Sequence, residues 1–310
     1  MTAVTPLPVP GQTRSVRLGG VDPRSALPRG VGRSDPTTQL TPSSYVRAVH
    51  TPDGPGTVRL RWNAAGHVDV AAWGPGAERL LDAAPFWLGL RDDVSTFRPG
   101  HPLVAELWRR GPGARMGAGR FVWPEIPPTV ICQRVQFRDA ARSWRQLVRR
   151  YGTPAPGPVP GLLLGPSPER LAALRYHDLH RFDLERRRAD ALLVAARHAG
   201  RLEAAADMMP EAAVARLQAL PGLGPWTATS LAQAVLGSPD VVVLGDFWMP
   251  TIVRYALTGD RTWCPDDAPM LELLEPFAGH RGRVVRLLAA AGFLPSRRAP
   301  RREAHRIADR

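Results

Sequence analysis

The chain reads Leu220-Pro221-Gly222-Leu223-Gly224-Pro225-Trp226-Thr227-Ala228 between two segments with a helical apolar pattern. The first segment covers residues 211–220 and the second covers 226–236. Two glycines at this spacing permit a tight turn, at positive φ where needed, and expose backbone amides that no Cβ covers. Unpaired N–H groups at the start of the second helix suit a nucleic-acid phosphate, because the helix dipole is positive there. The same residues also fit an ordinary turn between two helices.

The charge of the chain points to an acidic partner. The 310 residues carry a formal net charge of +13, which favours a partner such as nucleic acid. All 41 basic residues are arginine, and the sequence contains no lysine. The chain therefore has no side-chain amine that could form a Schiff base.

Cysteine content and hydropathy limit the cofactors and the location. Cys132 and Cys264 are the only cysteines, too few for a four-cysteine zinc or iron–sulfur site or for a disulfide scaffold. We expect Cys132 to be buried. We also expect the protein to have no metal site and no cofactor. No apolar run approaches the ~18 residues that a membrane helix needs, and the start of the chain lacks a signal-peptide pattern. We therefore expect no membrane partner and a cytoplasmic protein, nucleoid-associated if bacterial.

The pattern along the chain predicts an α+β protein with a β-rich part followed by a helical part. Residues 1–40 are rich in Pro, Gly, Ser, Thr and Arg and predict a disordered tail. Residues 41–100 predict a small antiparallel β-domain with a short helix over 76–81. Within it, residues 57–62 and 67–70 alternate between apolar and polar side chains.

The second half of the chain follows a helical period. Residues 101–294 predict an all-α domain with short connections, including one helical run over 129–151. Residues 295–310 predict a basic C-terminal tail. We expect the protein to act as a monomer.

A second motif follows the Pro-Gly turn and shifts the interpretation toward chemistry. It reads Val241-Val242-Val243-Leu244-Gly245-Asp246-Phe247. Together the two motifs resemble the helix-hairpin-helix DNA glycosylase superfamily with its Gly/Pro-rich loop and Asp (HhH-GPD), and Trp226-Thr227-Ala228 is most similar to its 3-methyladenine DNA glycosylase II branch. The resemblance extends over about residues 40–292. It implies a small N-terminal β-domain, an all-α helix-hairpin-helix core, and excision of damaged bases from double-stranded DNA.

The resemblance assigns catalysis to Asp246. Cleavage of an N-glycosidic bond builds positive charge on the deoxyribose, which a nearby carboxylate stabilises. The alternative role for Asp246 is to cap the helix that begins at Phe247, and one side chain can do both. In superfamily members that also cleave the strand, a lysine stands two residues after the second hairpin glycine. Trp226 occupies that position here, which implies a monofunctional enzyme that leaves an abasic site.

Base excision also requires residues that hold the flipped base and fill the gap it leaves. Gln133-Arg134 stands where the family has glutamine followed by an apolar wedge, and Arg134 departs from that pattern. His280 stands about where the family has an aromatic residue of its base pocket. For each aromatic candidate, packing in a core is the alternative. The pocket or wedge candidates are Trp123, Gln133, Arg134, Phe247, Trp248, Tyr255 and His280. Phe121, two residues before Trp123, is a further aromatic candidate.

The hairpin is expected to bind the DNA backbone rather than the base. The amides of Gly222, Leu223 and Gly224 are the predicted phosphate ligands, Thr227 is a candidate hydroxyl donor, and Trp226 completes the hairpin. The expected substrates are alkylated purines such as 3-methyladenine. The alternatives are a glycosylase for hypoxanthine, uracil or oxidised guanine, and a noncatalytic hairpin protein that senses DNA damage.

Overall fold

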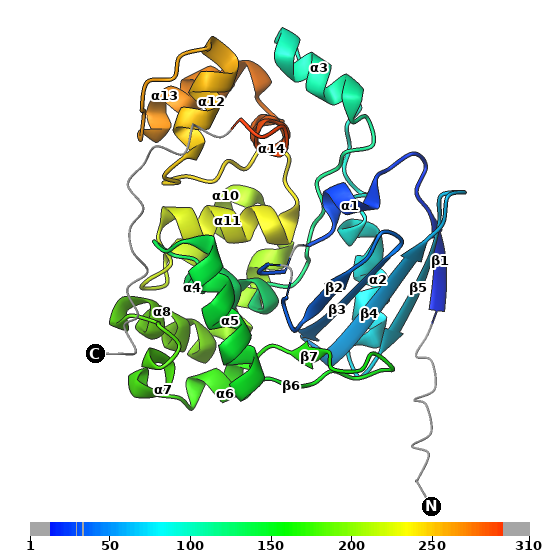
Figure 1. Ribbon diagram of the computed structural model, residues 1–310, viewed down its shortest axis with the longest axis vertical. Helices are drawn as coiled ribbons and strands as arrows, with labels where there is room; N and C mark the ends of the chain where they lie inside the picture. The colour runs from blue at the N-terminus through cyan, green and yellow to red at the C-terminus, as the bar shows by residue number, and fades with distance from the viewer. Residues whose placement is uncertain (1–12, 29, 33, 294–310) are drawn as a thin grey trace, which may run out of the picture.

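The computed structural model describes residues 13–28, 30–32 and 34–293. One antiparallel sheet lies beside a larger helical part, as Figure 1 shows. The predicted α+β class, with the sheet first and the helices after it, is confirmed. No helix in the described ranges is both long and apolar enough to cross a bilayer.

The sheet has five strands in the order β1-β5-β4-β3-β2. Its centre is formed by β3, β4 and β5, which pair in the sequence order that the alternating pattern predicts. Val58 and Leu60 on β4 are fully buried, whereas Arg61 is exposed, so one face of the strand enters a core. The strands are β1 (Thr13–Arg17), β2 (Thr38–Leu40), β3 (Ser44–Thr51), β4 (Gly54–Trp62) and β5 (His67–Trp73).

Both edge strands come from the segment predicted to be a disordered tail, so that prediction is wrong for the described part of residues 13–40. Thr13 lies opposite Ala71 on β5, and Leu40 lies opposite Tyr45 on β3. β1 and β2 are short and largely polar, and they alternate too little to be recognised as strands. Each of them is held as a strand by its neighbour in the sheet, because an edge strand needs hydrogen bonds to only one partner strand. Residues 1–12 and the predicted basic tail 295–310 lie outside the described residues.

One helix from the β-rich part covers a face of the sheet. α2 (Ala77–Trp87) packs against β4 and β5. It continues well past the predicted end at residue 81, although Pro85 lies inside it. Trp87 is buried in the sheet core beside Phe121, so burial of the last helical turn outweighs the hydrogen bond that Pro85 cannot make.

The other elements of the described chain are helices, apart from the short pair β6 (Thr153–Pro154) and β7 (Leu163–Leu164). The 3₁₀ segments are η1 (Trp123–Glu125), η2 (Ala204–Asp207) and η3 (Glu275–Phe277). The remaining helices are α1 (Pro23–Ala26), α3 (Pro102–Arg110), α4 (Ile126–Ile131), α5 (Phe137–Tyr151), α6 (Pro168–Ala172), α7 (Tyr176–His180), α8 (Arg186–Arg197), α9 (Ala199–Glu203), α10 (Pro210–Gln218), α11 (Pro225–Leu236), α12 (Met249–Thr258), α13 (Asp267–Leu274) and α14 (Arg281–Ala290).

The helices bury their apolar faces in two separate cores. The larger core lies among α4, α5, α8 and α11. The smaller one joins α3 to α12, α13 and α14, which form their own layer at the top of Figure 1. The loop between α11 and α12 passes from one core to the other, because Val241 packs against the first and Val242 belongs to the second.

Two helix boundaries differ from the predicted ones. The single helical run predicted over 129–151 is broken, because α4 ends at Ile131 and Arg134 adopts a left-handed conformation with φ 53°. The helix predicted to begin at Phe247 begins instead at Met249. The residues before it form the loop that carries Asp246.

Candidate active site

The predicted helical hairpin is formed by α10, a six-residue turn over residues 219–224, and α11. Gly222 has φ 90°, a conformation that glycine adopts without steric strain. Gly224 is the residue before α11, and its carbonyl accepts the amide of Ala228 at 2.9 Å. The amides of Trp226 and Thr227 lie in the first turn of α11, where a helix offers no internal acceptor. Together with the amide of Gly224 directly before the helix, these amides form the part of the hairpin that can bind an anion.

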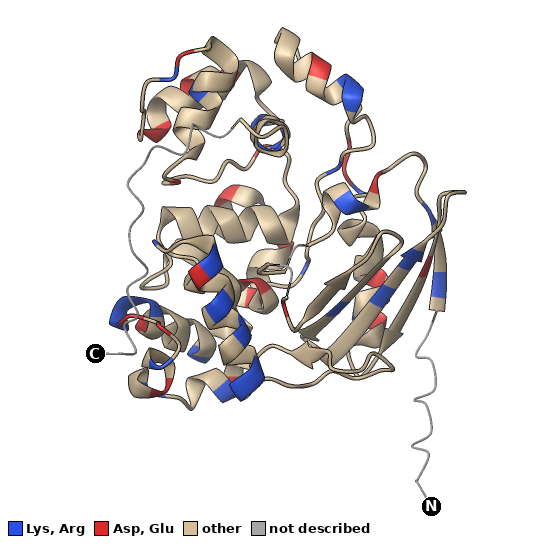
Figure 2. Ribbon diagram, in the orientation of Figure 1, with Lys and Arg blue, Asp and Glu red and all other residues tan. Residues whose placement is uncertain are grey.

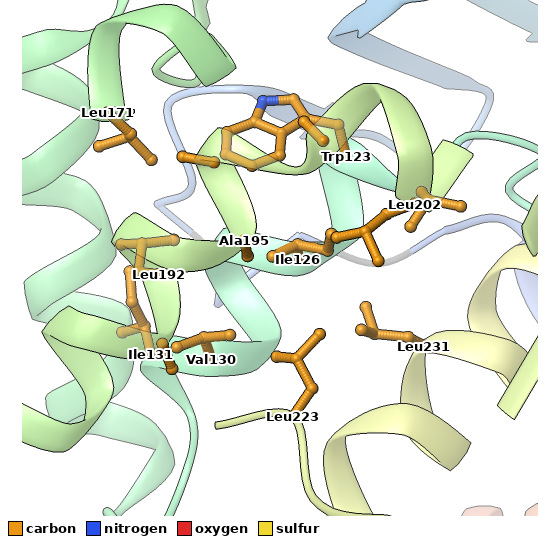
Figure 3. Close-up of a cluster of buried hydrophobic side chains, with 14 of the residues drawn as sticks. Trp123, Ile126, Val130, Ile131, Leu171, Leu192, Ala195, Leu202, Leu223 and Leu231 are labelled. Atoms are coloured by element: carbon orange, nitrogen blue, oxygen red, sulfur yellow. The ribbon is translucent and has the colours of Figure 1, made fainter. Parts of the chain in front are cut away.

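Leu223 anchors the turn instead of offering its amide. Its N–H donates to the carbonyl of Leu220 at 3.1 Å, so the prediction that this amide binds phosphate is wrong. Its side chain is buried and points into the cluster that contains Val130 and Leu231, as Figure 3 shows. Burial of this leucine fixes the height of the turn above the helical core.

Gln133 braces the hairpin from the turn between α4 and α5. Its Nε2 donates to the carbonyl of Gly222 at 3.0 Å and to Oγ1 of Thr227 at 2.8 Å. Thr227 is buried, so its hydroxyl lies inside the hairpin and not on the surface, contrary to the prediction that it contacts phosphate. Gln133 therefore holds the hairpin and is not placed as a base ligand.

Arg134 follows Gln133 at the tip of the same turn. The residue is exposed and has φ 53°, a conformation that costs a non-glycine residue on the order of 1–2 kcal/mol. The bond from Gln133 to Gly222 places this turn beside the hairpin. Arg134 is thus the predicted wedge residue that the structure leaves on the surface next to the candidate phosphate site.

Asp246 is held by three hydrogen-bond donors, one on α11, one at the first residue of α12 and one directly before α12. Its Oδ1 accepts the amides of Trp248 at 2.8 Å and Met249 at 2.9 Å. Its Oδ2 accepts the indole Nε1–H of Trp226 at 3.2 Å. The side chain therefore caps α12, the alternative role considered from the sequence, and the positive end of the helix stabilises the negative charge. The carboxylate remains half-exposed, so capping does not remove it from solvent.

Three aromatic side chains form an exposed cluster beside Asp246. Phe247 lies 4.9 Å from Trp248 and 4.6 Å from Trp263, and the two tryptophans are 5.3 Å apart, all measured between ring centroids. Phe247 is 62% exposed and Trp263 is 43% exposed. Exposed aromatic rings in mutual contact can stack on a nucleobase, because each base presents a π face. Two of the predicted pocket residues, Phe247 and Trp248, are therefore brought together next to the carboxylate.

The structure buries other pocket candidates inside cores. Trp123 lies in the larger helical core and its Nε1 donates to the carbonyl of Pro166 at 3.2 Å. Phe121 is buried in the sheet core. For these two, the alternative of core packing is correct, since neither ring has a face left for a base.

Two further candidates form contacts of their own. His280 is buried, with Nε2 2.9 Å from Oγ1 of Thr96 and with its ring against Phe97, so it is a structural residue and not a pocket residue. The hydroxyl of Tyr255 accepts Nη2 of Arg261 at 2.8 Å, which places this ring in a contact separate from the aromatic cluster.

Sequence reasoning missed several residues that shape this region. Trp263 and Asp267 lie in and after the loop that follows α12, and no periodic pattern links them to Asp246. Oδ2 of Asp267 accepts the amide of Gly245 at 2.7 Å. Thr229 and Gln233 were recognisable in principle, because they share the face of α11 that carries Trp226.

The structure also bears on metals and thiols. Within residues 13–28, 30–32 and 34–293, no group of three or more His, Cys, Asp and Glu side chains is arranged to hold a metal ion. Cys132 is partly buried against the larger helical core, and this burial raises the pKa of its thiol to about 11. The thiol is therefore a packing group at neutral pH.

Comparison with known proteins places the fold among DNA glycosylases. No protein-family model matches the chain, and no curated protein matches it in sequence. Among solved structures, the 3-methyladenine DNA glycosylase of Archaeoglobus fulgidus is similar with a TM-score of 0.72 and 19% identity, covering 91% of this chain and 99% of that one. The protein MBOgg1, solved with a low-affinity DNA ligand, is similar with a TM-score of 0.66 and 16% identity, over 91% of this chain and 96% of that one.

A third solved structure extends the same comparison. The 8-oxoguanine glycosylase/lyase of Clostridium acetobutylicum, bound to double-stranded DNA with cytosine opposite 8-oxoguanine, is similar with a TM-score of 0.56 and 13% identity. The match covers 81% of this chain and 95% of that one. At these identities the likeness establishes a shared fold that runs through both the sheet and the helical part.

Proposed function

We propose that the chain is a monofunctional DNA glycosylase that hydrolyses the N-glycosidic bond of alkylated purines, such as 3-methyladenine, in double-stranded DNA. The product is an abasic site, and the enzyme acts as a monomer without a metal or cofactor. The observation that carries the proposal is the half-exposed Asp246 carboxylate, held at the start of α12 between the hairpin and the aromatic cluster. The shared fold supports the proposal.

Asp246 supplies the charge that the reaction requires. As the glycosidic bond breaks, the deoxyribose becomes an oxocarbenium-like cation, and a carboxylate in fixed position stabilises it electrostatically and guides water. Oδ1 is committed to two backbone amides. Among the described residues, Oδ2 accepts one hydrogen bond, from the indole N–H of Trp226, and it retains a lone pair for the sugar or for the attacking water.

The residue at position 226 limits the reaction to hydrolysis. A lyase step through an imine needs an amine nucleophile, whereas Trp226 offers only an indole N–H and the sequence has no lysine at all. The indole points at the carboxylate of Asp246. The reaction therefore stops at the abasic site.

Backbone binding comes from the hairpin and the surrounding arginines. The amides of Gly224, Trp226 and Thr227 receive one DNA phosphate, and Arg134 contacts the backbone beside it. Further arginines lie along α5 and in the first turn of α8, as Figure 2 shows. Together with the net charge of +13, they supply a sequence-independent and salt-sensitive part of the affinity.

The aromatic cluster and the single carboxylate favour a purine that leaves easily. Phe247, Trp248 and Trp263 provide the surface for the flipped base. An alkylated purine such as 3-methyladenine is already cationic, so its departure needs no strong general acid, and Asp246 has no second carboxylate assigned to that task. A noncatalytic damage sensor would share the hairpin and the charge, and it would need the Asp246 carboxylate only as the cap of α12.

A panel of duplexes tests the activity. Each duplex carries one defined lesion, 3-methyladenine, 7-methylguanine, hypoxanthine, uracil or 8-oxoguanine, and alkali then reveals abasic sites. We expect strand breaks after alkali for the alkylated purines and none without alkali. Breaks without alkali would contradict the monofunctional assignment. Tight binding without product from any lesion would support the damage sensor instead.

The substitution Asp246→Asn tests the role of the carboxylate. It keeps an acceptor for the α12 amides but removes the negative charge. We expect the single-turnover excision rate to fall about a hundredfold or more, while the Kd for the same duplex stays nearly unchanged. Excision at the wild-type rate would show that Asp246 serves only as a helix cap.

A further inference from the structure

We propose that three side chains on one face of α11 form a positioning device for the candidate catalytic carboxylate, and that Trp226 is its direct contact. The inference rests on the proposed role of Asp246. Trp226 is then a positioning residue in this chain, in addition to being the residue that excludes a lyase amine.

The geometry of α11 supports this assignment. Trp226, Thr229 and Gln233 follow one another at intervals of three and four residues, which places them on one face of a helix. Each of them bonds to the loop that follows α11. Gln233 Nε2 donates to the carbonyl of Val241 at 2.9 Å, Oγ1 of Thr229 accepts the amide of Leu244 at 3.1 Å, and Trp226 Nε1 donates to Oδ2 of Asp246 at 3.2 Å.

The same loop is fixed from its other side by α13. Oδ2 of Asp267 accepts the amide of Gly245 at 2.7 Å, directly before Asp246. Gly245 has φ 71°, and a Cβ on it would lie 3.8 Å from Cβ of Trp226. The chain thus turns sharply between two anchors, so the direction of the Asp246 side chain is set by contacts on both sides.

These contacts give the three residues one shared effect. The hairpin amides begin the same helix whose face holds the loop, so a phosphate bound at the start of α11 and the carboxylate of Asp246 are placed by one rigid element. A carboxylate that is displaced from the sugar by about 1 Å loses much of its effect on the rate of excision. The device therefore acts on the rate of the chemical step, and DNA affinity depends on it little.

Two conservative variants test the proposal on the lesion that the wild-type enzyme excises fastest. Trp226→Phe retains an aromatic ring but removes the N–H, and Thr229→Val retains the shape but removes the hydroxyl. We expect each to lower the single-turnover excision rate by about tenfold, as loss of a hydrogen bond to a charged group or to its support implies, with an unchanged Kd. Two controls remove the same groups elsewhere. Trp62→Phe breaks an indole bond to the carbonyl of Pro42 beside the sheet, and Thr57→Val removes a buried hydroxyl that has no hydrogen-bond partner among the described residues.

A measurement without DNA checks the indole contact directly. The ¹H–¹⁵N spectrum of the tryptophan indoles is recorded for the wild type and for Asp246→Ala, and the Trp226 signal is identified by its loss in Trp226→Phe. We expect this signal to move in Asp246→Ala and to stay in place in Asp53→Ala, which removes an exposed carboxylate paired with Arg79. This result does not depend on any glycosylase activity.

The outcomes separate the inference from the proposed function. Wild-type protein that excises no lesion would overturn the proposed function, whatever the indole signal does. The positioning device alone would be overturned if Trp226→Phe and Thr229→Val excised the lesion as fast as the two controls. It would also be overturned if the Trp226 indole signal did not move in Asp246→Ala. A rise in Kd that accounts for the whole loss in kcat/KM would also overturn it, because the side chains would then act on binding.

Discussion

At the scale of single residues, His280 shows how burial changes the chemistry of a side chain. Nδ1 accepts Nε of Arg283 at 3.2 Å, so Nε2 carries the proton and donates it to Oγ1 of Thr96. Burial lowers the pKa of His280, and the nearby Arg283 guanidinium lowers it further, against the opposing carboxylates of Asp92, Asp240 and Asp93. A second proton would break the bond from Arg283 and place two cations side by side.

This arrangement predicts a pH dependence of stability. Because the folded state holds His280 neutral, the unfolded chain binds a proton that the folded chain does not, near the ordinary histidine pKa of about 6.5. The contribution of neutral His280 to the free energy of unfolding is therefore fully present above this pH. It is lost as the pH falls toward the lowered pKa of the folded state. We expect the urea midpoint to fall less between pH 7.5 and 5.5 in His280→Gln than in the wild type. His177→Gln, at an exposed position, controls for the loss of a histidine, and equal slopes in wild type and His280→Gln would contradict the prediction.

Residue identity alone could not tell a site residue from a core residue here. Asp246, Phe247 and Trp248 were identified from a short motif, and the structure groups them. Trp123 and His280 were misassigned, because segments far away in the chain, at Pro166 and at Thr96, cover them. Burial of an aromatic ring depends on such long-range packing, which a local pattern does not record.

At the scale of elements, the hairpin glycines have different tasks. A Cβ on Gly222 would lie 2.4 Å from Cβ of Ala191 on α8 and 3.0 Å from its Cα. Nothing lies within 4 Å of the corresponding point on Gly224, and Gly224 has φ −71°. Gly222 thus lets α8 approach the turn, whereas Gly224 keeps the surface in front of the amides open.

The two glycines therefore predict two separable defects. We expect Gly222→Ala to lower the free energy of unfolding by about 2 kcal/mol, because the backbone must move away from α8. Gly224→Val is expected to leave stability nearly unchanged and to weaken binding to all duplexes alike, damaged or not, because the side chain blocks the phosphate. Urea denaturation and fluorescence anisotropy measure the two effects. A loss of affinity confined to damaged duplexes in Gly224→Val would contradict the phosphate role.

Elements with clear boundary residues or a regular apolar pattern could be predicted from the sequence. Elements that are ordered only by a neighbouring strand or helix could not. α11 begins one residue before its predicted start at 226 and ends at its predicted end at 236, because Pro225 marks its start and Gly237 its end. β1 was missed, since its only inward apolar residue is Val16 and its order comes from β5. The break after Ile131 was also missed, because no glycine marks the left-handed turn at Arg134.

At the scale of the whole molecule, one ion pair joins the sheet to the helical part. Nη2 of Arg47 on β3 lies 2.7 Å from Oε1 of Glu125 on η1, and the two side chains are only 6% and 13% exposed. The Arg47 guanidinium also lies over the ring of Trp87, 5.7 Å from its centroid. A buried pair of this kind is strongly destabilising when one partner is removed, because the other charge stays buried.

This pair predicts that the sheet and the helices unfold together. We expect Glu125→Gln to lower the free energy of unfolding by about 3 kcal/mol. The double variant Arg47→Met/Glu125→Leu is expected to recover most of that loss, because it leaves no unpaired charge. As the matched control, Asp82→Asn removes the exposed pair with Arg14 and costs less than about 1 kcal/mol. An effect of Glu125→Gln as small as that of Asp82→Asn would contradict the coupling.

The short path from the start of α11 to Asp246 also has a consequence for where on DNA the protein can work. Trp226 supplies both a backbone amide in the first turn of α11, where we propose that a phosphate binds, and the indole that donates to Asp246. In the proposed enzyme, this turn fixes the distance between the bound phosphate and the sugar that faces Asp246. For the proposed enzyme, we therefore expect slower excision of a lesion next to a nick or a strand end where that phosphate is missing.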